Sequence, residues 1–276
     1  MPEVVEVYSQ AQKLKKYVGQ MIIGINWDKV SKFDRKQIPG LDLFALPLII
    51  QDVYSRGKII IIKCDKNIYL VNHLGMTGFW SSRKTKHSNF WIKFGKEVKE
   101  GLYSETKRTY FTDQRHFGNI SICSKLKDVY KKNGPCVLQT VFQKCKKNNT
   151  EFLKQDIITR DYCHECLSKY KKEVCEFLLE QKYVSGIGNY LRAEILYHAR
   201  IHPLKKNLNE KERNKLYDKM IEVVYLVYKS FQRDDNVQKY DFSVYMQKND
   251  LEGNSIEQFK HKTRMVHFCP AKQKLL

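Results

Sequence analysis

The two residues after the initiator methionine carry the groups with the clearest chemistry. Removal of Met1 turns Pro2 into a terminal secondary amine, and Glu3 places a carboxylate directly beside it. An α-amino group titrates at about pH 8, roughly two units below a lysine side chain, and a helix dipole at this position lowers its pKa further. A neutral amine can attack a sugar C1′ and displace the base through an imine-type intermediate, with the carboxylate transferring protons. The alternative is that Pro2 merely begins a helix, where proline is common.

The Gly-Ile-Gly-Asn run at 186–189 is a second chemical signal. Glycines at the start of a helix leave backbone N–H groups free, and such groups bind phosphate. Asn189 can cap that helix and also donate from its side-chain amide. The alternative is an ordinary glycine-rich helix start without a ligand. We therefore expect an anion site at this helix N-terminus.

The charge of the chain points to a polyanionic partner. Its 276 residues include 50 Lys and Arg against 30 Asp and Glu, a net charge of +20, which favours nucleic acid or an anionic membrane surface. No apolar run approaches the roughly 20 residues that cross a bilayer, and the Met-Pro-Glu start is neither a secretion signal nor a transit peptide. Eight cysteines without a secretion signal indicate reduced thiols. We expect an intracellular protein, nuclear or cytoplasmic, that binds nucleic acid and not membrane.

Hydrophobic spacing in the first half of the chain predicts the elements that position these groups. Apolar residues three or four apart predict a helix over 3–19. Short runs rich in Ile, Val and aromatic residues then predict strands that build a β-sandwich. The expected strands are Met21–Ile25, Lys58–Lys63, Ile68–His73, Asn89–Phe94, Arg108–Thr112 and Asn119–Cys123.

The second half of the chain predicts helices followed by a small hairpin, so the expected fold class is α+β. The expected helices are Lys172–Gln181, Asn189–Ala199 and Glu210–Phe231. The expected strands are Phe242–Met246, Ile256–Phe259 and Met265–Phe268. The domain boundaries that follow are a helix and β-sandwich over 1–125, a linker rich in Lys and Asn over 126–150, a helical domain over 151–236 and a hairpin over 237–276.

Five collinear motifs resemble the formamidopyrimidine-DNA glycosylase and endonuclease VIII family, over roughly residues 1–270. They are MPEVVEV at 1–7, RGKIII at 56–61, HLGMTG at 73–78, TDQRHFGNI at 112–120 and LLEQKYVSGIGNYLRAEILYHARIHP at 178–203, which is similar to the family's helix–two-turn–helix signature. The resemblance implies a base-excision-repair enzyme that is both a DNA N-glycosylase and a lyase at abasic sites. It implies β/δ-elimination through a Schiff base on an N-terminal proline, with no cofactor.

The resemblance also implies roles for the matched catalytic positions. Pro2 is the expected Schiff-base nucleophile, and Glu3 and Glu6 are expected to assist proton transfer. Lys58 is expected at the end of a β-hairpin, where it holds a phosphate near the lesion. Without its motif, Lys58 would be read as one surface lysine among many.

A set of DNA-contacting residues is implied in the same way. His73 and Met76 belong to the HLGM turn, and Met76 is expected to fill the gap that a flipped nucleotide leaves. Arg115 is expected to bond the orphaned opposite base, while Phe117 wedges into the base stack. Outside these motifs, Met76 and Phe117 would be read as ordinary core residues. Glu194, past the glycine turn, is expected to support that turn.

Family members often end in a zinc finger with two Cys-x-x-Cys pairs, and this chain departs from that pattern. Residues 245–254 contain no cysteine, and the final pair has become Cys269-Pro-Ala-Lys272. One thiolate cannot build a four-ligand zinc site, so we expect a zincless hairpin that keeps its shape. Arg264 in its turn is expected to reach phosphates beside the flipped nucleotide. Cys163-His-Glu-Cys166 is the remaining Cys-x-x-Cys pair, which is half a metal site.

Two further departures bear on the substrate. The stretch between Phe231 and Phe242 is short and lacks glycine, whereas formamidopyrimidine-type members have a longer, glycine-bearing loop that folds over oxidised purines. This difference implies an endonuclease VIII-like preference for oxidised pyrimidines, with formamidopyrimidines and hydantoins as further substrates. Val4-Val5 replaces the usual residue-plus-proline before Glu6, which loosens the geometry around the nucleophile.

Two alternative functions stay open at this point. A non-catalytic protein on the same scaffold would bind lesions or single strands, and a retained Met1 would favour it because the amine is then blocked. A basic RNA- or ribosome-associated protein is the second alternative. The intact Pro2–Glu3 pair favours the enzyme, with damaged single- or double-stranded DNA as its partner and a monomer as the expected state.

Overall fold

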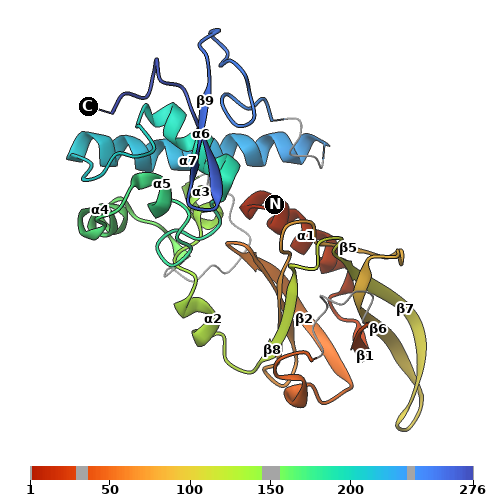
Figure 1. Cartoon of the computed structure of the whole chain (residues 1–276). Helices are drawn as coiled ribbons and strands as arrows, with labels where there is room; N and C mark the ends of the chain where they lie inside the picture. Colours follow the sequence, from red (N-terminus) through yellow and green to blue (C-terminus); the bar gives the residue numbers. More distant parts are fainter. Residues whose placement is uncertain (1, 29–36, 145–155, 235–239, 276) are drawn as a thin grey trace. The chain divides into compact units, whose positions relative to one another are not determined.

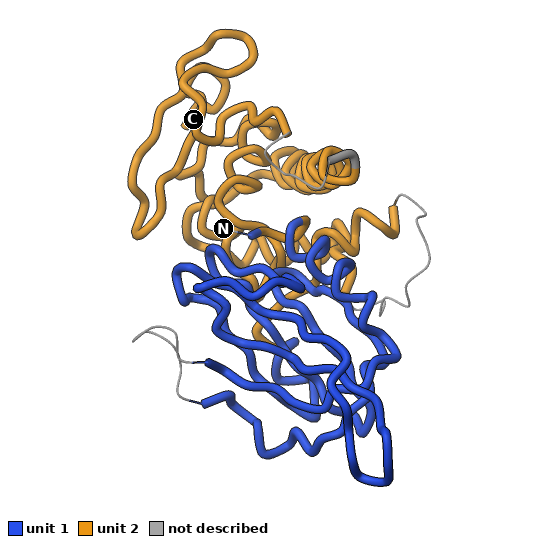
Figure 2. The backbone as a smooth tube through the Cα atoms, turned by 90° about the vertical axis from the view of Figure 1, so that its right-hand side faces the viewer, with its two compact units in different colours: residues 1–2, 6–130 blue, residues 3–5, 131–276 orange. Residues whose placement is uncertain are grey.

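The computed structural model describes residues 2–28, 37–144, 156–234 and 240–275. The chain divides into two compact units (Figure 2). The N-terminal unit is Met1–Pro2 with Glu6–Tyr130, and the C-terminal unit is Glu3–Val5 with Lys131–Leu276. Three residues from the start of the chain therefore belong to the C-terminal unit.

The N-terminal unit contains most of α1 (Val4–Leu14), the 3-10 helix η1 (Lys15–Tyr17) and an eight-stranded sheet (Figure 1). Its strands are β1 (Met21–Trp27), β2 (Leu48–Arg56), β3 (Ile59–Cys64), β4 (Tyr69–His73), β5 (Phe79–Ser81), β6 (Ser88–Lys99), β7 (Leu102–Thr112) and β8 (Asn119–Cys123). They hydrogen bond in the order β5-β7-β6-β1-β2-β3-β4-β8. The short helices η2 (Leu41–Leu43) and α2 (Lys127–Lys131) lie in the connections before β2 and after β8.

The sheet turns back on itself where β1 meets β2. These strands pair only through Met21↔Ile49 and Ile22↔Leu48, and the two halves of the sheet bury their inner faces in one core. That core includes Phe90, Phe94 and Phe111 from one half, Ile60, Ile62 and Leu70 from the other, and Val7, Ala11 and Leu14 from α1. The predicted helix followed by a β-sandwich is confirmed.

All six predicted strands are present in this unit, but β2 and β5 were not expected. Along β2, Gln51 and Asp52 interrupt the apolar pattern, and the pairing register with β3 shifts between Ile50 and Asp52. A bulge of this kind breaks the two-residue alternation on which strand prediction depends. β5 has three residues, too few to show any period.

The C-terminal unit is built around the long helix α7 (Glu210–Asp234), against which α3 (Val137–Lys144), α4 (Arg160–Lys169) and α6 (Asn189–Ala199) pack. A single-turn helix, α5 (Val174–Phe177), precedes α6. The strands β9 (Glu257–His261) and β10 (Arg264–Phe268) form the predicted hairpin near the C-terminus (Figure 1). No described helix has the length and apolar character that crossing a membrane requires.

Two predictions about the helices of this unit are corrected. The segment 126–150 was expected to be a linker, but residues 137–144 form α3, whose side chains from Val137 to Phe142 are buried; residues 145–150 lie outside the described part. The helix expected over 172–181 is wrong in length: only the single helical turn of α5 forms, and the residues after it lie in non-helical turns. α6 begins and ends where it was predicted.

The strand expected over 242–246 does not form, and Glu194 supplies the reason. Its buried carboxylate accepts the backbone N–H groups of Ser243 at 2.9 Å, Val244 at 3.0 Å and Tyr245 at 2.9 Å. These amides are satisfied by a side chain from α6 instead of a neighbouring strand. Glu194 thus fixes the chain that leads into the β9–β10 hairpin.

Candidate active site and nucleic-acid interface

The carboxylate of Glu3 caps the N-terminus of α6 within the C-terminal unit. Glu3 is 1% exposed, and its oxygens accept backbone N–H groups from Gly188 at 2.6 Å, Tyr190 at 2.9 Å and Leu191 at 3.3 Å. The next backbone N–H, that of Val4, donates to the Gly186 carbonyl at 3.0 Å. A negative group at the positive end of the helix dipole is favourably placed. The start of the chain is therefore tied to the glycine turn before α6.

This arrangement corrects the expected phosphate site at 186–189. Glu3 already occupies the N–H groups of Gly188, Tyr190 and Leu191, which were expected to hold an anion. Asn189 is not the N-cap residue either, because Gly188 holds that position and Asn189 is the first residue of α6. A Cβ on Gly188 would lie 2.3 Å from Glu3 Oε1, so glycine is needed here to admit the carboxylate.

Pro2 and Glu6 flank this anchor in the sequence. Both side chains are half-buried, and Glu6 lies in the first turn of α1. Met1 lies outside the described residues, so its removal stays a prediction. The structure does fix Glu3, the residue after Pro2, through its bonds to the start of α6.

In the N-terminal unit, Asp113 locks together the two loops that carry the predicted DNA-contacting residues. Its buried carboxylate accepts from the Thr77 hydroxyl at 2.5 Å, the Gly118 N–H at 2.6 Å and the Arg115 N–H at 3.2 Å. Gly75, at φ +68°, is in such close contact that a Cβ there would meet the Gly118 nitrogen at 2.4 Å. The loops at 74–78 and 113–118 consequently form one joined structure.

Met76, Arg115 and Phe117, which were predicted to contact DNA around a flipped nucleotide, lie on these joined loops. Phe117 is 58% exposed, which rules out the reading that it is a core residue. The Arg115 guanidinium lies over the Phe117 ring, 5.3 Å from its centre, and Arg115 is itself exposed. Met76 is half-buried in its turn. An exposed aromatic ring beside a cation has the character of a group that stacks on bases.

Strand register brings Lys58 and His73 to the same end of the sheet as these loops. Lys58 is half-buried in the tight turn between β2 and β3, after Gly57 at φ +55°. The residue after it, Ile59, pairs with His73, and His73 pairs with Asn119 at the start of β8. The predicted hairpin position of Lys58 is therefore confirmed as geometry.

In the C-terminal unit, the β9–β10 hairpin is bonded to the start of α6. The side-chain amide of Asn189 donates to the Met265 carbonyl at 3.1 Å. Arg192 donates to the same carbonyl at 2.9 Å and to Asn189 Oδ1 at 2.6 Å. Arg264, the residue before Met265, is exposed. Two of the predicted phosphate contacts, Asn189 and Arg264, are thus brought close together.

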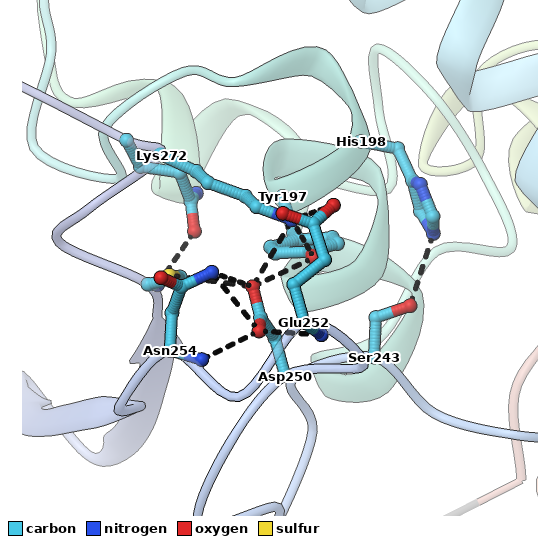
Figure 3. Close-up of polar contacts among 9 residues, drawn as sticks. Tyr197, His198, Ser243, Asp250, Glu252, Asn254 and Lys272 are labelled. Carbon is cyan, nitrogen blue, oxygen red and sulfur yellow. Dashed lines mark hydrogen bonds and ion pairs between the residues drawn. The ribbon is translucent and has the colours of Figure 1, made fainter.

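A buried polar cluster lies at the base of the β9–β10 hairpin, where the sequence predicted a hairpin without zinc. Figure 3 shows Asp250 facing Tyr197, Asn254 and Lys272. Asp250 accepts from the Tyr197 hydroxyl at 3.0 Å and lies 3.1 Å from Lys272 Nζ, which also contacts Glu252 at 2.7 Å. Burial favours neutral Asp250, but hydrogen bonds from Asn254 and Lys272 outweigh it and hold its pKa well below the usual range.

The Cys269 thiol belongs to the same cluster, 3.7 Å from Asp250 Oδ2. The backbone N–H of Cys269 donates to Gln273 Oε1 at 2.8 Å, and Gln273 donates in turn to the Ile201 carbonyl at 2.8 Å. Ion pairs and hydrogen bonds therefore hold the base of the hairpin in this structure.

Among the described residues, one grouping has metal-ligand geometry: Glu173, Glu176 and His261. Its carboxylates already contact lysines, since Lys206 lies 3.1 Å from Glu173 and Lys262 contacts Glu176. The Cys163–Cys166 pair lies on α4 and does not belong to any such group in the described part of the chain. Burial raises the pKa of Cys163 to about 12.

Sequence reasoning missed Asp113, Arg192 and Asp250. Each is a charged residue that the structure buries, with 0%, 1% and 6% exposure. A charged residue is usually read as surface, and the partners of these three are set by tertiary contacts. For Asp113 a signal was present, because it is the second residue of the TDQRHFGNI motif.

Comparisons with known proteins agree across the chain. The family models "Formamidopyrimidine-DNA glycosylase N-terminal domain" and "Formamidopyrimidine-DNA glycosylase H2TH domain" match residues 1–120 and 150–231. The formamidopyrimidine-DNA glycosylase of Lactococcus lactis subsp. cremoris is 27% identical over 99% of each chain. Two crystal structures of the Lactococcus lactis enzyme are similar, each with a TM-score of 0.77 and 26% identity. One holds DNA with an abasic site and covers 99% of both chains; the other holds DNA with an oxidised pyrimidine and covers 99% of this chain and 100% of that chain.

Proposed function

The chain belongs to the formamidopyrimidine-DNA glycosylase and endonuclease VIII family of DNA glycosylases, and we propose that it is a bifunctional glycosylase and abasic-site lyase. In this proposal the Pro2 amine attacks C1′ of the damaged nucleotide as the base departs. The resulting imine acidifies the sugar protons, so that β-elimination and then δ-elimination break the strand on either side of the sugar. Water finally hydrolyses the imine and frees the amine.

The observation that carries the proposal is the capture of Glu3 by three backbone N–H groups at the start of α6. A nucleophile must be held still to reach a near-attack geometry. Glu3 is bonded directly to Pro2 along the chain, so its capture restrains the position of Pro2. We assign Glu3 this anchoring role together with proton transfer. Glu6, half-buried one turn along α1, is the second proposed proton carrier.

The proposed DNA contacts fall into two classes. Met76, Arg115 and Phe117, on the loops joined by Asp113, would fill the space left by a flipped nucleotide and contact the opposite base. The remaining proposed contacts are directed to phosphates or to the backbone beside them: Lys58, His73, Asn189 and Arg264. Contacts of the second class position DNA without reading its sequence.

The proposed substrates are oxidised bases, with oxidised pyrimidines first and formamidopyrimidines and hydantoins after them. The short, glycine-free stretch between Phe231 and Phe242 supports this order; residues 235–239 lie outside the described part. The related Lactococcus lactis enzyme has been crystallised with an oxidised pyrimidine in its DNA. Damaged bases are also the easiest to unstack.

Product analysis tests this proposal. Duplex and single-stranded oligonucleotides that contain thymine glycol, 8-oxoguanine or an abasic site are incubated with the protein, and the ends are resolved on a sequencing gel. We expect base release from thymine glycol and a 3′-phosphate end, the product of β- and δ-elimination. Binding without any cleavage, even at the abasic site, would reject the enzyme and favour a lesion-binding protein on this scaffold.

A further inference from the structure

Arg192 is a buried cation placed between α6 and the hairpin. It is 1% exposed and lies three residues after Asn189, on the same side of the helix. One guanidinium nitrogen donates to Asn189 Oδ1 at 2.6 Å and to the Met265 carbonyl at 2.9 Å. The side chain therefore bonds both to a proposed phosphate-binding residue and to the strand that carries Arg264.

The charge of Arg192 is not neutralised by direct contact with a carboxylate anywhere in the described residues. Its Nε atom is buried and has no hydrogen-bond partner among them. Burial, and the nearby charge of Arg264, lower the pKa of Arg192, while Cys175 and Glu3 act in the opposite direction. A buried guanidinium in this setting is costly, so its retention calls for a role beyond packing.

The contacts of Asn189 indicate what that role is. Its Oδ1 faces Arg192, and its Nδ2 donates one N–H to the Met265 carbonyl at 3.1 Å. Nδ2 carries a second N–H, for which the described residues provide no acceptor. The two ends of an asparagine amide have nearly the same shape but opposite hydrogen-bonding character. If the amide turned over, it would present an oxygen in place of that N–H and repel a phosphate.

We propose that Arg192 is a positioning residue that fixes the side-chain amide of Asn189 with its oxygen inward, so that the remaining N–H is held ready for a DNA phosphate. The inference rests on the proposed function, which assigns Asn189 that phosphate contact. Arg192 itself is too deeply buried to touch DNA, and its effect passes through Asn189. Through its bond to the Met265 carbonyl, Arg192 also ties the strand β10, next to Arg264, to α6.

A double-mutant cycle tests this coupling. The variants are N189A, R192M, the double variant, R192K as a conservative rescue, and R160M as a matched control. Arg160 belongs to the same unit and bonds to Asn214 and Asp218, neither of which is a proposed DNA contact. Affinity for a duplex with a tetrahydrofuran abasic analogue is measured by fluorescence anisotropy over a salt series, and melting curves verify folding.

We expect N189A and R192M each to lose roughly tenfold in affinity and the double variant to lose no more than N189A. R192K, whose ammonium can still donate to Oδ1, is expected to stay within about threefold of the unaltered protein, and R160M to match it. The slope of log Kd against log salt is expected to stay the same in R192M, since no phosphate contact by a cation is lost.

Any of four outcomes would overturn the inference. Losses that multiply in the double variant would show that Arg192 acts independently of Asn189. A shallower salt slope in R192M would mean that its charge acts on phosphate directly. If N189A bound DNA weakly while R192M bound it normally, the coupling of Arg192 to Asn189 would be rejected, but the phosphate contact of Asn189 would not. If R192M fails to fold, failure of R192K to restore affinity decides against the inference. Failure of the proposed function is recognised separately, as absence of cleavage by the unaltered protein.

Discussion

The Glu3 carboxylate accepts the backbone N–H of Gly188 at 2.6 Å, across 185 positions of sequence. Through this bond the residue beside the proposed nucleophile is fixed to the first turn of α6. The glycine turn predicted to bind a phosphate is thus used to hold the chain's own N-terminal carboxylate. Positioning of the N-terminus and stability of the C-terminal unit should consequently depend on the same side chain.

The first prediction concerns Glu3. In Glu3→Gln the side chain keeps its size, but an NH2 group then faces backbone N–H donors. We expect a loss of about 2 kcal/mol in the free energy of unfolding and a fall of at least about 100-fold in single-turnover cleavage of abasic DNA. Urea denaturation and quenched kinetics measure the two effects. Glu6→Gln, whose side chain is half-buried, is the control for stability. An unchanged unfolding free energy in Glu3→Gln would contradict the anchoring role.

The second prediction concerns Phe117. Because this ring is 58% exposed, Phe117→Ala should change the unfolding free energy by less than about 0.5 kcal/mol. Cleavage of a lesion in duplex DNA should fall roughly tenfold, and cleavage in single-stranded DNA much less, because only the duplex has a stack to wedge open. Gln114→Ala, on an exposed neighbour in the same loop, serves as control. Equal losses on both substrates would remove the wedge role.

The third prediction concerns acid stability. Burial opposes ionisation of Glu176, but bonds from Lys262 and His261 outweigh it and lower its pKa from 4.5 to about 2. A lowered folded-state pKa means that the carboxylate stabilises the fold above about pH 4.5, and that this contribution is lost as the pH falls toward 2. Lys262 is exposed and its attraction is screened by solvent, so we expect the Glu176 carboxylate to contribute about 1 kcal/mol to the free energy of unfolding.

Urea unfolding of Glu176→Gln at pH 7 and pH 3 measures this contribution. The variant should be less stable than the unaltered protein at pH 7, and the gap should narrow at pH 3. A gap that stays constant or widens at low pH would show that the carboxylate is not held by these partners. Glu165→Gln, an exposed i,i+4 partner of Lys169, is the control and should show no such narrowing.

The fourth prediction concerns the base of the hairpin. Lys272→Met leaves Asp250 buried without its cation, and we expect a loss of about 3 kcal/mol in unfolding free energy. Adding Asp250→Asn should recover part of that loss, because the uncompensated charge is then removed. Thermal melts of the unaltered protein, Lys272→Met and the double variant compare their stabilities. The melt of the unaltered protein is repeated with a chelator to test for a bound metal. A chelator-sensitive melting temperature in the unaltered protein would mean that a metal, and not this cluster, holds the hairpin.

Much of the fold was predictable because local pattern and tertiary environment agree. The Ile-rich run of β3 is buried on both faces, and α6 is bounded by Gly188 before it and Arg200 after it. β2 was missed because a bulge breaks its alternation. α3 was missed because it lies in a Lys- and Asn-rich segment whose six buried residues are hidden by that composition.

The site was predictable in its residues but not in its bonding. Motif positions led to Lys58, Phe117 and Asn189, and the structure places each on a turn, loop or helix start as expected. The partners of Glu3 and Glu194 could not be read from spacing, because each carboxylate binds backbone amides far away in sequence. Such long-range capture also explains why backbone N–H groups of the glycine turn are not free for a phosphate, as predicted, and why the strand predicted at 242–246 does not form.

Borohydride trapping on abasic-site DNA tests most directly whether the Pro2 amine is the nucleophile. Protein with Met1 removed is compared with protein in which Met1 is retained, and the two are matched for DNA binding by anisotropy. The assignment of Pro2 as nucleophile predicts a strong covalent protein–DNA band for the first form and a far weaker one for the second, because a retained Met1 turns the Pro2 nitrogen into an amide that cannot attack C1′. Equal bands from both forms, or no band from either despite tight binding, would contradict it.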